Sequence, residues 1–179
     1  FEQIKGFGDY GFPESHAASF ALLVYVSAWL KRHEPAAFYC GLLNSQPMGF
    51  YSPSQLVQDA KRHDIEVRPV DINCSGWEST LEKPSRQGEI ASTQPAIRLG
   101  FQRIKGLKQN TAQRIIEARN NAPINDLKDI THRAMIDKGD LARLTEGGAF
   151  KTLSGHRYQT HWQARGLMPE SPLLGSQGA

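Results

Sequence analysis

The chain has 179 residues, of which 39% are hydrophobic and 22% charged, and its formal net charge is +3. These apolar residues are enough to form a core, which excludes wholesale disorder. The two cysteines, Cys40 and Cys74, form neither a CxxC pair nor a zinc-binding spacing, so the sequence predicts no disulfide framework and favours a reducing cytoplasm.

The first fourteen residues, FEQIKGFGDYGFPE, include three glycines and one proline and are typical of a loop with close turns. They begin without methionine and lack the pattern of a signal peptide, so we expect a piece of a longer protein. Ser15 follows and is suited to cap a long helix over residues 15–33.

The middle of this helix, residues 18–30, is almost entirely apolar. A membrane-spanning helix needs about 20 apolar residues, so this run is too short and we expect a helix buried on most sides. A turn of 100° per residue aligns one stripe of five residues: His16, Phe20, Leu23, Ser27 and Lys31. This stripe is suited to face a nucleotide. The alternative is a core helix with a satisfied histidine.

Two shorter helices are expected next. Residues 34–45 form the first, with Pro35 in its opening turn. Residues 52–63 form the second, with Ser52 as the cap and Pro53 at the first helical position.

The segment that follows predicts a small β component. Alternating apolar residues in 64–73 indicate a short strand. Two strand-like pieces, 76–82 and 96–101, flank a polar loop over 82–95 and are expected to pair as a long hairpin. Helical patterns then return, so the fold class is mainly α with a small β component. The expected division is residues 1–70, 71–96, 97–153 and 154–179.

A basic helical hairpin is expected over residues 97–119, which contain six Lys or Arg and one Glu, a net charge of +5 against +3 for the whole chain. In IKGLKQN, Gly106 permits a tight turn, and Ile104 and Leu107 can anchor that turn in the core. The next helix then presents free backbone N–H groups near its start. Such a helix N-terminus binds phosphate well.

This pattern resembles a helix-hairpin-helix DNA-binding motif, which holds the nucleic-acid backbone without reading bases. The usual turn reads Gly-hydrophobic-Gly, whereas here Lys108 stands in place of the second glycine and either supplies charge or impedes close approach. The alternative is a solvated basic face around an ordinary helical turn. The candidate DNA-binding residues are Arg103, Lys105, Gly106, Leu107, Lys108, Gln109, Asn110, Thr111 and Arg114.

Residues 137–150, DKGDLARLTEGGAF, are a weaker echo of the same unit. Their three acidic side chains oppose phosphate, so we interpret the echo as structural, with three apolar residues packing against the first hairpin: Leu141, Leu144 and Phe150. A last helix is expected after residue 154. Its His156 and His161 lie about 140° apart without a third ligand, which argues against a metal hydrolase, and Trp162 is expected to pack this helix on the hairpins.

Two long stretches, GFPESHAASFALL and NSQPMGFYSPSQLVQDA, are similar to the bacterial C-family DNA polymerases, the family of the DNA polymerase III alpha subunit. They resemble its error-prone, damage-induced branch in particular. Downstream, AIRLGFQRIKGL and GHRYQTHW match the helix-hairpin-helix part of the same family. The resemblance covers residues 1 to about 167.

The resemblance implies that residues 1–70 belong to the fingers, where Ser15, His16 and Phe20 face the sugar and base of an incoming dNTP. Residues 97–153 would be a tandem helix-hairpin-helix domain that holds the primer–template duplex. The implied function is error-prone, DNA-directed DNA synthesis in damage tolerance and induced mutagenesis. The implied partners are DNA, dNTP, the other polymerase domains and, through parts outside this sequence, a sliding clamp and damage-response proteins; no membrane is involved.

Two departures distinguish this sequence from replicative members of the family. Pro13 and Glu14 replace an Asn-Lys pair, and Phe20 replaces the usual Tyr. We expect both changes to loosen the hold on the nucleotide, as in a low-fidelity enzyme.

The resemblance also implies that Mg²⁺ is held by palm carboxylates, which phosphoryl transfer requires. This chain has no DxD motif, and its aspartates are interpreted as surface or turn residues: Asp9, Asp59, Asp64, Asp71, Asp126, Asp129, Asp137 and Asp140. We therefore expect no catalytic residue, metal site or cofactor here, Mg²⁺ for the parent polymerase, and no synthesis by this chain alone. The alternative function is a free-standing helix-hairpin-helix DNA-binding module.

Overall fold

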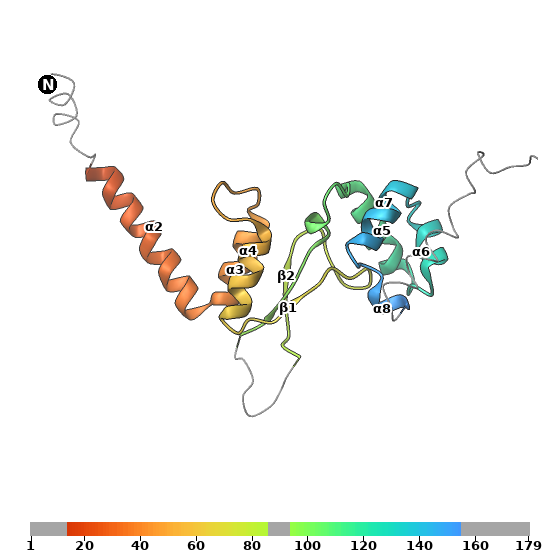
Figure 1. The fold of residues 1–179 in the computed structure, drawn as a ribbon, viewed down its shortest axis with the longest axis horizontal. Coiled ribbons are helices and arrows are strands. Elements are labelled where there is room, and N and C mark those ends of the chain that lie inside the picture. Colours follow the sequence, from red (N-terminus) through yellow and green to blue (C-terminus); the bar gives the residue numbers. More distant parts are fainter. Residues whose placement is uncertain (1–13, 86–93, 155–179) are drawn as a thin grey trace, which may run out of the picture.

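The computed structural model describes residues 14–85 and 94–154, except for the side chains of residues 14–16 and 154. Helices lie on both sides of a small sheet (Figure 1), so the expected mainly α fold with a small β component is confirmed. The elements are α2 (Glu14–His33), α3 (Pro35–Asn44), α4 (Pro53–Arg62), β1 (Val67–Arg68), β2 (Thr80–Glu82), β3 (Ala96–Arg98), the 3₁₀ helix η1 (Phe101–Arg103), α5 (Gln109–Asn121), α6 (Leu127–Arg133), α7 (Lys138–Glu146) and α8 (Lys151–Ser154).

Local capping signals set the starts of α3 and α4 as expected. Pro35 stands in the first turn of α3. Ser52 and Gln55 form a reciprocal capping box at α4, with Ser52 N donating to Gln55 Oε1 at 2.9 Å and Gln55 N donating to Ser52 Oγ at 3.3 Å. The predicted cap of α2 is wrong, because the helix already includes Glu14 and Ser15.

The expected burial of α2 is also wrong. Residues 18–29 are exposed throughout, including Leu22, Val24 and Tyr25, which are 64–68% exposed. The reason is length: twenty residues span about 30 Å, whereas the helix packs on the ten-residue α3 and extends away from the rest of the molecule (Figure 1). No helix within the described ranges is both long and apolar enough to cross a membrane.

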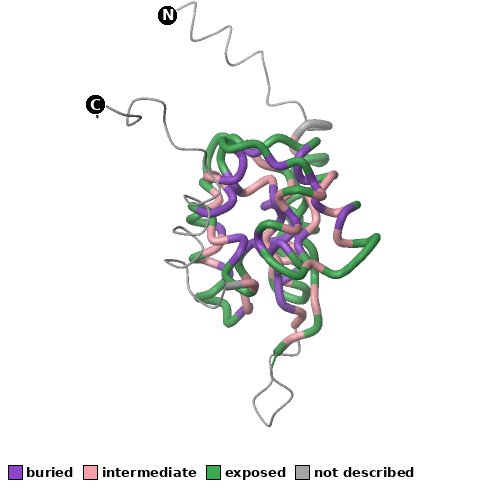
Figure 2. Tube along the Cα trace, turned by 90° about the vertical axis from the view of Figure 1, so that its right-hand side faces the viewer, coloured by how far each residue is buried: buried purple, intermediate pink, exposed green. Residues whose placement is uncertain are grey.

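The sheet joins the two halves of the molecule. Its strand order is β1-β3-β2, with Val67 parallel to Ile97 and Leu81 antiparallel to Ile97, which confirms the expected strand and long hairpin. Ile97 packs into the core of α3 and α4, while Val70 and Ile72 pack into the core of α5, α6 and α7. Buried residues concentrate in the middle of the molecule (Figure 2). The cores therefore cross the boundaries expected at residues 70 and 97.

Charged side chains tie the three strands together at the edge of the sheet. Arg68 Nε lies 2.9 Å from Glu66 Oε1, and its Nη1 lies 2.5 Å from Glu82 Oε2. Glu82 Oε1 in turn accepts from Arg98 Nε at 3.0 Å. Ser85 Oγ and N donate to Glu66 at 2.7 and 2.9 Å. These bonds stabilise the ionised form of Glu66, and its pKa falls from 4.5 to about 2.

This network predicts a loss of stability in acid. Because the folded-state pKa of Glu66 is depressed, its contribution is present above pH 4.5 and is lost as the pH falls towards about 2. We expect Glu66→Gln to flatten the decline of the urea unfolding midpoint across this window. Glu117→Gln, which removes an exposed carboxylate on α5, is the matched control. Parallel acid declines for Glu66→Gln and the unsubstituted chain would contradict the prediction.

Candidate nucleic-acid interface

The first hairpin, defined as residues 104–108, joins η1 to α5. Ile104 and Leu107 are each 7% exposed, and Leu107 N donates to Ile104 O at 3.2 Å. Between them, Gly106 has a φ of +77°, in the left-handed region that favours glycine. The predicted tight turn with two apolar anchors is confirmed.

The start of α5 lies directly after this turn. Lys108 occupies the N-cap position, and its side chain makes no capping bond within the described residues. Ala112 N donates to Lys108 O at 3.2 Å, so the amides of residues 109–111 precede the first intrahelical bond. Gln109 and Asn110 are exposed at this end. Such a helix end attracts anions through its amides and its dipole.

Two lysines flank these amides. Lys105 is exposed on the turn. The side chain of Lys108 is 68% exposed, and its Nζ lies 3.9 Å from Asp137 Oδ2. Asp137 is the N-cap residue of α7, and its side chain is half-exposed. An exposed pair at this distance holds Lys108 only weakly. Both ammonium groups can therefore reach a phosphate that approaches the start of α5.

Three of the other candidate residues turn inwards. Thr111 is 1% exposed, and its hydroxyl donates to Asp140 Oδ2 at 2.5 Å. Arg114 Nε donates to Ala134 O at 2.8 Å, which links α5 to the end of α6. Arg103 Nε is buried without a hydrogen-bond partner among the described residues, and burial lowers the pKa of this guanidinium. Thr111 and Arg114 therefore stabilise the packing of α5 rather than facing solvent.

Asp140 and Arg143 were missed by sequence reasoning. Asp140 is fully buried within α7, so its assignment to the surface or a turn is wrong. Asp71 is also buried, at 7% exposed, but it does open a turn, where its Oδ1 accepts from Asn73 N at 2.8 Å. Asp140 Oδ1 accepts from Arg143 Nη1 at 2.7 Å. This bond brings Arg143 beside the first hairpin, where a Cβ on Gly106 would lie 3.1 Å from Arg143 Nε. The spacing of three along α7 predicts the Asp140–Arg143 pair but not the hairpin that it meets.

Basic side chains from the first hairpin region and from α7 line one cavity. A cavity of about 370 Å³ beside the first hairpin is lined by Arg103, Lys105 and Arg143, together with Glu146 of α7. Arg143 is 40% exposed along its side chain and so remains accessible from solvent. The interface therefore combines helix-terminal amides with basic groups from two separate segments.

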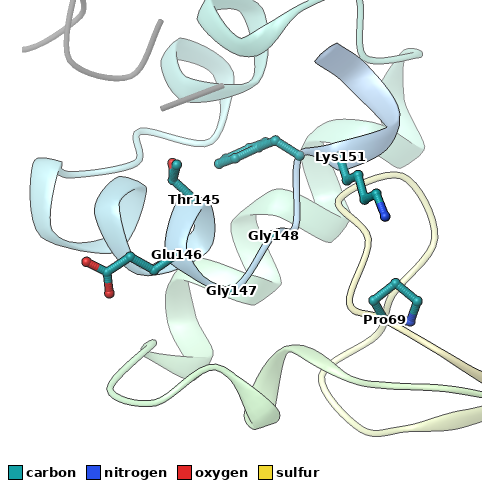
Figure 3. A pocket seen from close by; sticks show the side chains of 7 residues that line it. Pro69, Thr145, Glu146, Gly147, Gly148 and Lys151 are labelled. Carbon is teal, nitrogen blue, oxygen red and sulfur yellow. The ribbon is translucent and has the colours of Figure 1, made fainter. Parts of the chain in front are cut away.

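The second hairpin, residues 147–150, differs from the first because the backbone of the segment after β1 is hydrogen-bonded to it. Leu141, Leu144 and Phe150 are buried in the shared core, which confirms their predicted packing. Ala149 O accepts from Ile72 N at 2.8 Å. Thr152 Oγ1 donates to Asp71 Oδ1 at 3.0 Å. Glu146 and Lys151 flank a cavity of about 240 Å³ beside Gly147 and Gly148 of this hairpin (Figure 3).

Replacing Gly106 with alanine is expected to destabilise the chain by about 1–2 kcal/mol, because an L-residue is strained at positive φ. The new Cβ would also press on Arg143. Urea unfolding measures the effect. Gly41→Ala is the matched control: a Cβ there meets nothing within 4 Å, and alanine should stabilise α3 by up to about 1 kcal/mol. A neutral result at Gly106 with a stabilised Gly41 variant would refute the strain.

The predicted nucleotide-facing residues lie on α2. Ser15 and His16 belong to this helix, but their side chains lie outside the described residues. Phe20 is 53% exposed, and Lys31 Nζ donates to Asp59 Oδ2 at 3.2 Å. Residues 155–179, with His156, His161 and Trp162, lie outside the described part of the chain. Within that part, no three His, Cys, Asp or Glu side chains form a metal-binding group.

Comparisons with known proteins identify the same motif in this part of the chain. The family model of the helix-hairpin-helix motif matches residues 64–160. Three relatives carry the name "Error-prone DNA polymerase". They come from Azoarcus sp. strain BH72 (55% identical over 96% of this chain), Pseudomonas aeruginosa (53% over 97%) and Saccharophagus degradans (55% over 97%). The chain spans only 16–17% of the length of these relatives.

Proposed function

This chain belongs to the helix-hairpin-helix family, and we propose that it is the portion of an error-prone, C-family DNA-directed DNA polymerase that holds duplex DNA by its backbone. The observation that carries the proposal is the start of α5, where uncapped amides stand beside the exposed Lys105 and Lys108. Amides and cations at such a site bind phosphates irrespective of base sequence.

The match to the relatives supports a polymerase portion over a free-standing module. The helix-hairpin-helix model begins at residue 64, whereas the identity to the Azoarcus protein extends over 172 residues and so includes most of α2, α3 and α4. A free-standing module has no need for that additional sequence. We propose that the Mg²⁺-binding carboxylates of the parent lie outside this chain and that the chain alone does not extend a primer.

The proposed role of α2 is to face the incoming dNTP through Ser15, His16 and Phe20. Its support is the exposure of the middle of the helix, including Phe20 at 53%. Restoring the hydroxyl with Phe20→Tyr in the parent polymerase is expected to lower misincorporation, because the nucleotide gains a hydrogen-bonding group. Single-nucleotide insertion opposite each template base measures it. An unchanged error frequency would exclude this role for position 20.

A salt titration tests the proposed duplex binding. Fluorescence anisotropy of a labelled 20-bp duplex is followed with the 179-residue chain from 50 to 300 mM NaCl, on two unrelated sequences. We expect equal affinity for both sequences and a linear fall of log K with log salt, with a slope of about −0.9 for each phosphate contacted. Failure to bind the duplex at 50 mM NaCl would overturn the proposal for this chain.

A further inference from the structure

Helices α3 and α4 lie on the opposite side of the sheet from the first hairpin (Figure 1). They line a third cavity of about 400 Å³, here called the α3–α4 cavity, to which α2 contributes Lys31. This volume lies within the range of small-ligand sites. The hairpin interface does not use this cavity. Of the stripe predicted to face a nucleotide, only Lys31 lines it, and Lys31 follows Phe20 by eleven residues, about 16 Å along the helix.

The wall of the α3–α4 cavity is apolar and aromatic. Phe38 and Leu42 contribute from α3, and Leu56, which is 5% exposed, contributes from α4. Tyr51, in the loop between the two helices, also lines the cavity and is 58% exposed. The preceding Phe50 is 92% exposed. Exposed rings beside an apolar wall are the kind of surface on which nucleobases stack.

The remaining lining residues are polar or charged. Gln55, Asp59 and Arg62 follow one another at helical spacing along the lining face of α4, over about 10 Å. Asp59 is already committed, because its Oδ2 accepts from Tyr39 Oη at 2.6 Å and from Lys31 Nζ at 3.2 Å. These bonds hold the pKa of Asp59 below its ordinary value.

Arg62 is thus left available for an anion. It is exposed and forms no salt bridge within the described residues. Basic residues also make up the last turns of the two helices that meet here: Lys31, Arg32 and His33 on α2, and Lys61 and Arg62 on α4. The lining of the cavity therefore combines an exposed aromatic ring, Tyr51, with an exposed cation, Arg62.

We propose that the α3–α4 cavity binds one nucleotide of an unpaired DNA strand. The base stacks on Tyr51 beside the apolar wall, and the phosphate lies towards Arg62. The edge of the base accepts from Gln55 Nε2, since Gln55 Oε1 is used in the capping box with Ser52. A paired duplex does not fit this role, because its bases are already stacked on one another. This site goes beyond the proposed duplex binding and is independent of the first hairpin.

Binding of single-stranded DNA tests the proposal. Anisotropy of a fluorescein-labelled 12-nucleotide oligo(dT) is measured with the 179-residue chain at 100 mM NaCl. We expect Tyr51→Ala to weaken binding at least fivefold and Tyr51→Phe to retain it within twofold, because the phenyl ring preserves stacking. Arg62→Ala should also weaken binding. Lys128→Ala, an exposed cation on α6, is the matched control and should stay within twofold.

An oligonucleotide of the same length with abasic sugars separates stacking from charge. Tyr51→Ala and the unsubstituted chain should bind it equally. Equal affinity of the unsubstituted chain for oligo(dT) and the abasic strand would overturn the proposal, as would full binding by both Tyr51→Ala and Arg62→Ala. If micromolar free dTTP displaced oligo(dT), the cavity would be a site for a free nucleotide, and the proposal of a DNA strand would be overturned. Lys105→Ala/Lys108→Ala should retain oligo(dT) binding while losing duplex affinity, which distinguishes a failure here from a failure of the proposed function.

Discussion

Duplex DNA is expected to bind the Lys105→Ala/Lys108→Ala variant between tenfold and a hundredfold more weakly than the unsubstituted chain at 0.1 M salt. Each phosphate contact contributes about 0.9 to the slope of log K against log salt, so the loss of two contacts removes roughly 1.8. Both lysines are exposed at the start of α5, where the amides of residues 109–111 precede the first intrahelical bond. The measurement is the same salt titration by anisotropy, with the slope as the primary readout.

A matched control removes the same charge elsewhere. Lys83→Ala/Lys128→Ala also deletes two exposed lysines, one after β2 and one on α6, and should leave the slope within about half a unit. If both double variants lower the slope equally, binding is a property of net charge and the first hairpin has no special role.

The single variant Lys108→Gly decides what the lysine contributes at the position where the usual motif has glycine. If Lys108 supplies charge, the glycine variant binds duplex DNA more weakly, and its slope of log K against log salt is smaller in magnitude by about 0.9. An obstruction of backbone approach makes the glycine variant tighter. We expect the weaker outcome, because the Lys108 side chain is 68% exposed and its ammonium group is accessible to a phosphate.

Replacing Asp140 with alanine is expected to cost about 3 kcal/mol of unfolding free energy, the lower end for breaking a buried charged pair, because Arg143 is partly exposed. The fully buried Asp140 carboxylate accepts from Thr111 Oγ1 at 2.5 Å and from Arg143 Nη1 at 2.7 Å. Alanine leaves the buried Thr111 hydroxyl without its acceptor and frees Arg143 from its place beside Gly106. Urea unfolding with an unchanged m value measures the loss.

Two comparisons isolate the cause of this loss. Glu117→Gln, which alters an exposed carboxylate on α5, should change stability by no more than about 0.5 kcal/mol. In an Arg143→Ala background, Asp140→Ala should cost less than it does alone, because the pair is already broken. Additive costs would show that Asp140 and Arg143 do not interact, contrary to the structure.

The sequence alone determined the elements whose causes lie within a few residues. Ser52 and Gln55 cap α4 through contacts three positions apart, and the turn around Gly106 forms between Ile104 and Leu107. Caps and turns of this kind can be predicted from spacing and residue type. The concentration of positive charge over residues 97–119 can also be predicted from the sequence. They were sufficient to indicate the first hairpin and its lysines.

Only the tertiary structure decided which distant residues meet. Thr111 and Asp140 are 29 positions apart, and nothing in the local pattern of either predicts that the Thr111 hydroxyl donates a hydrogen bond to Asp140 in the core. Strand β1 pairs with β3 in parallel although 27 residues, 69–95, lie between Arg68 and Ala96. The same limit explains α2: an apolar sequence predicts a surface that avoids water, but burial depends on whether another element lies against it. Local propensity acts over one or two turns, whereas burial and ion pairing are set by the packing of whole elements.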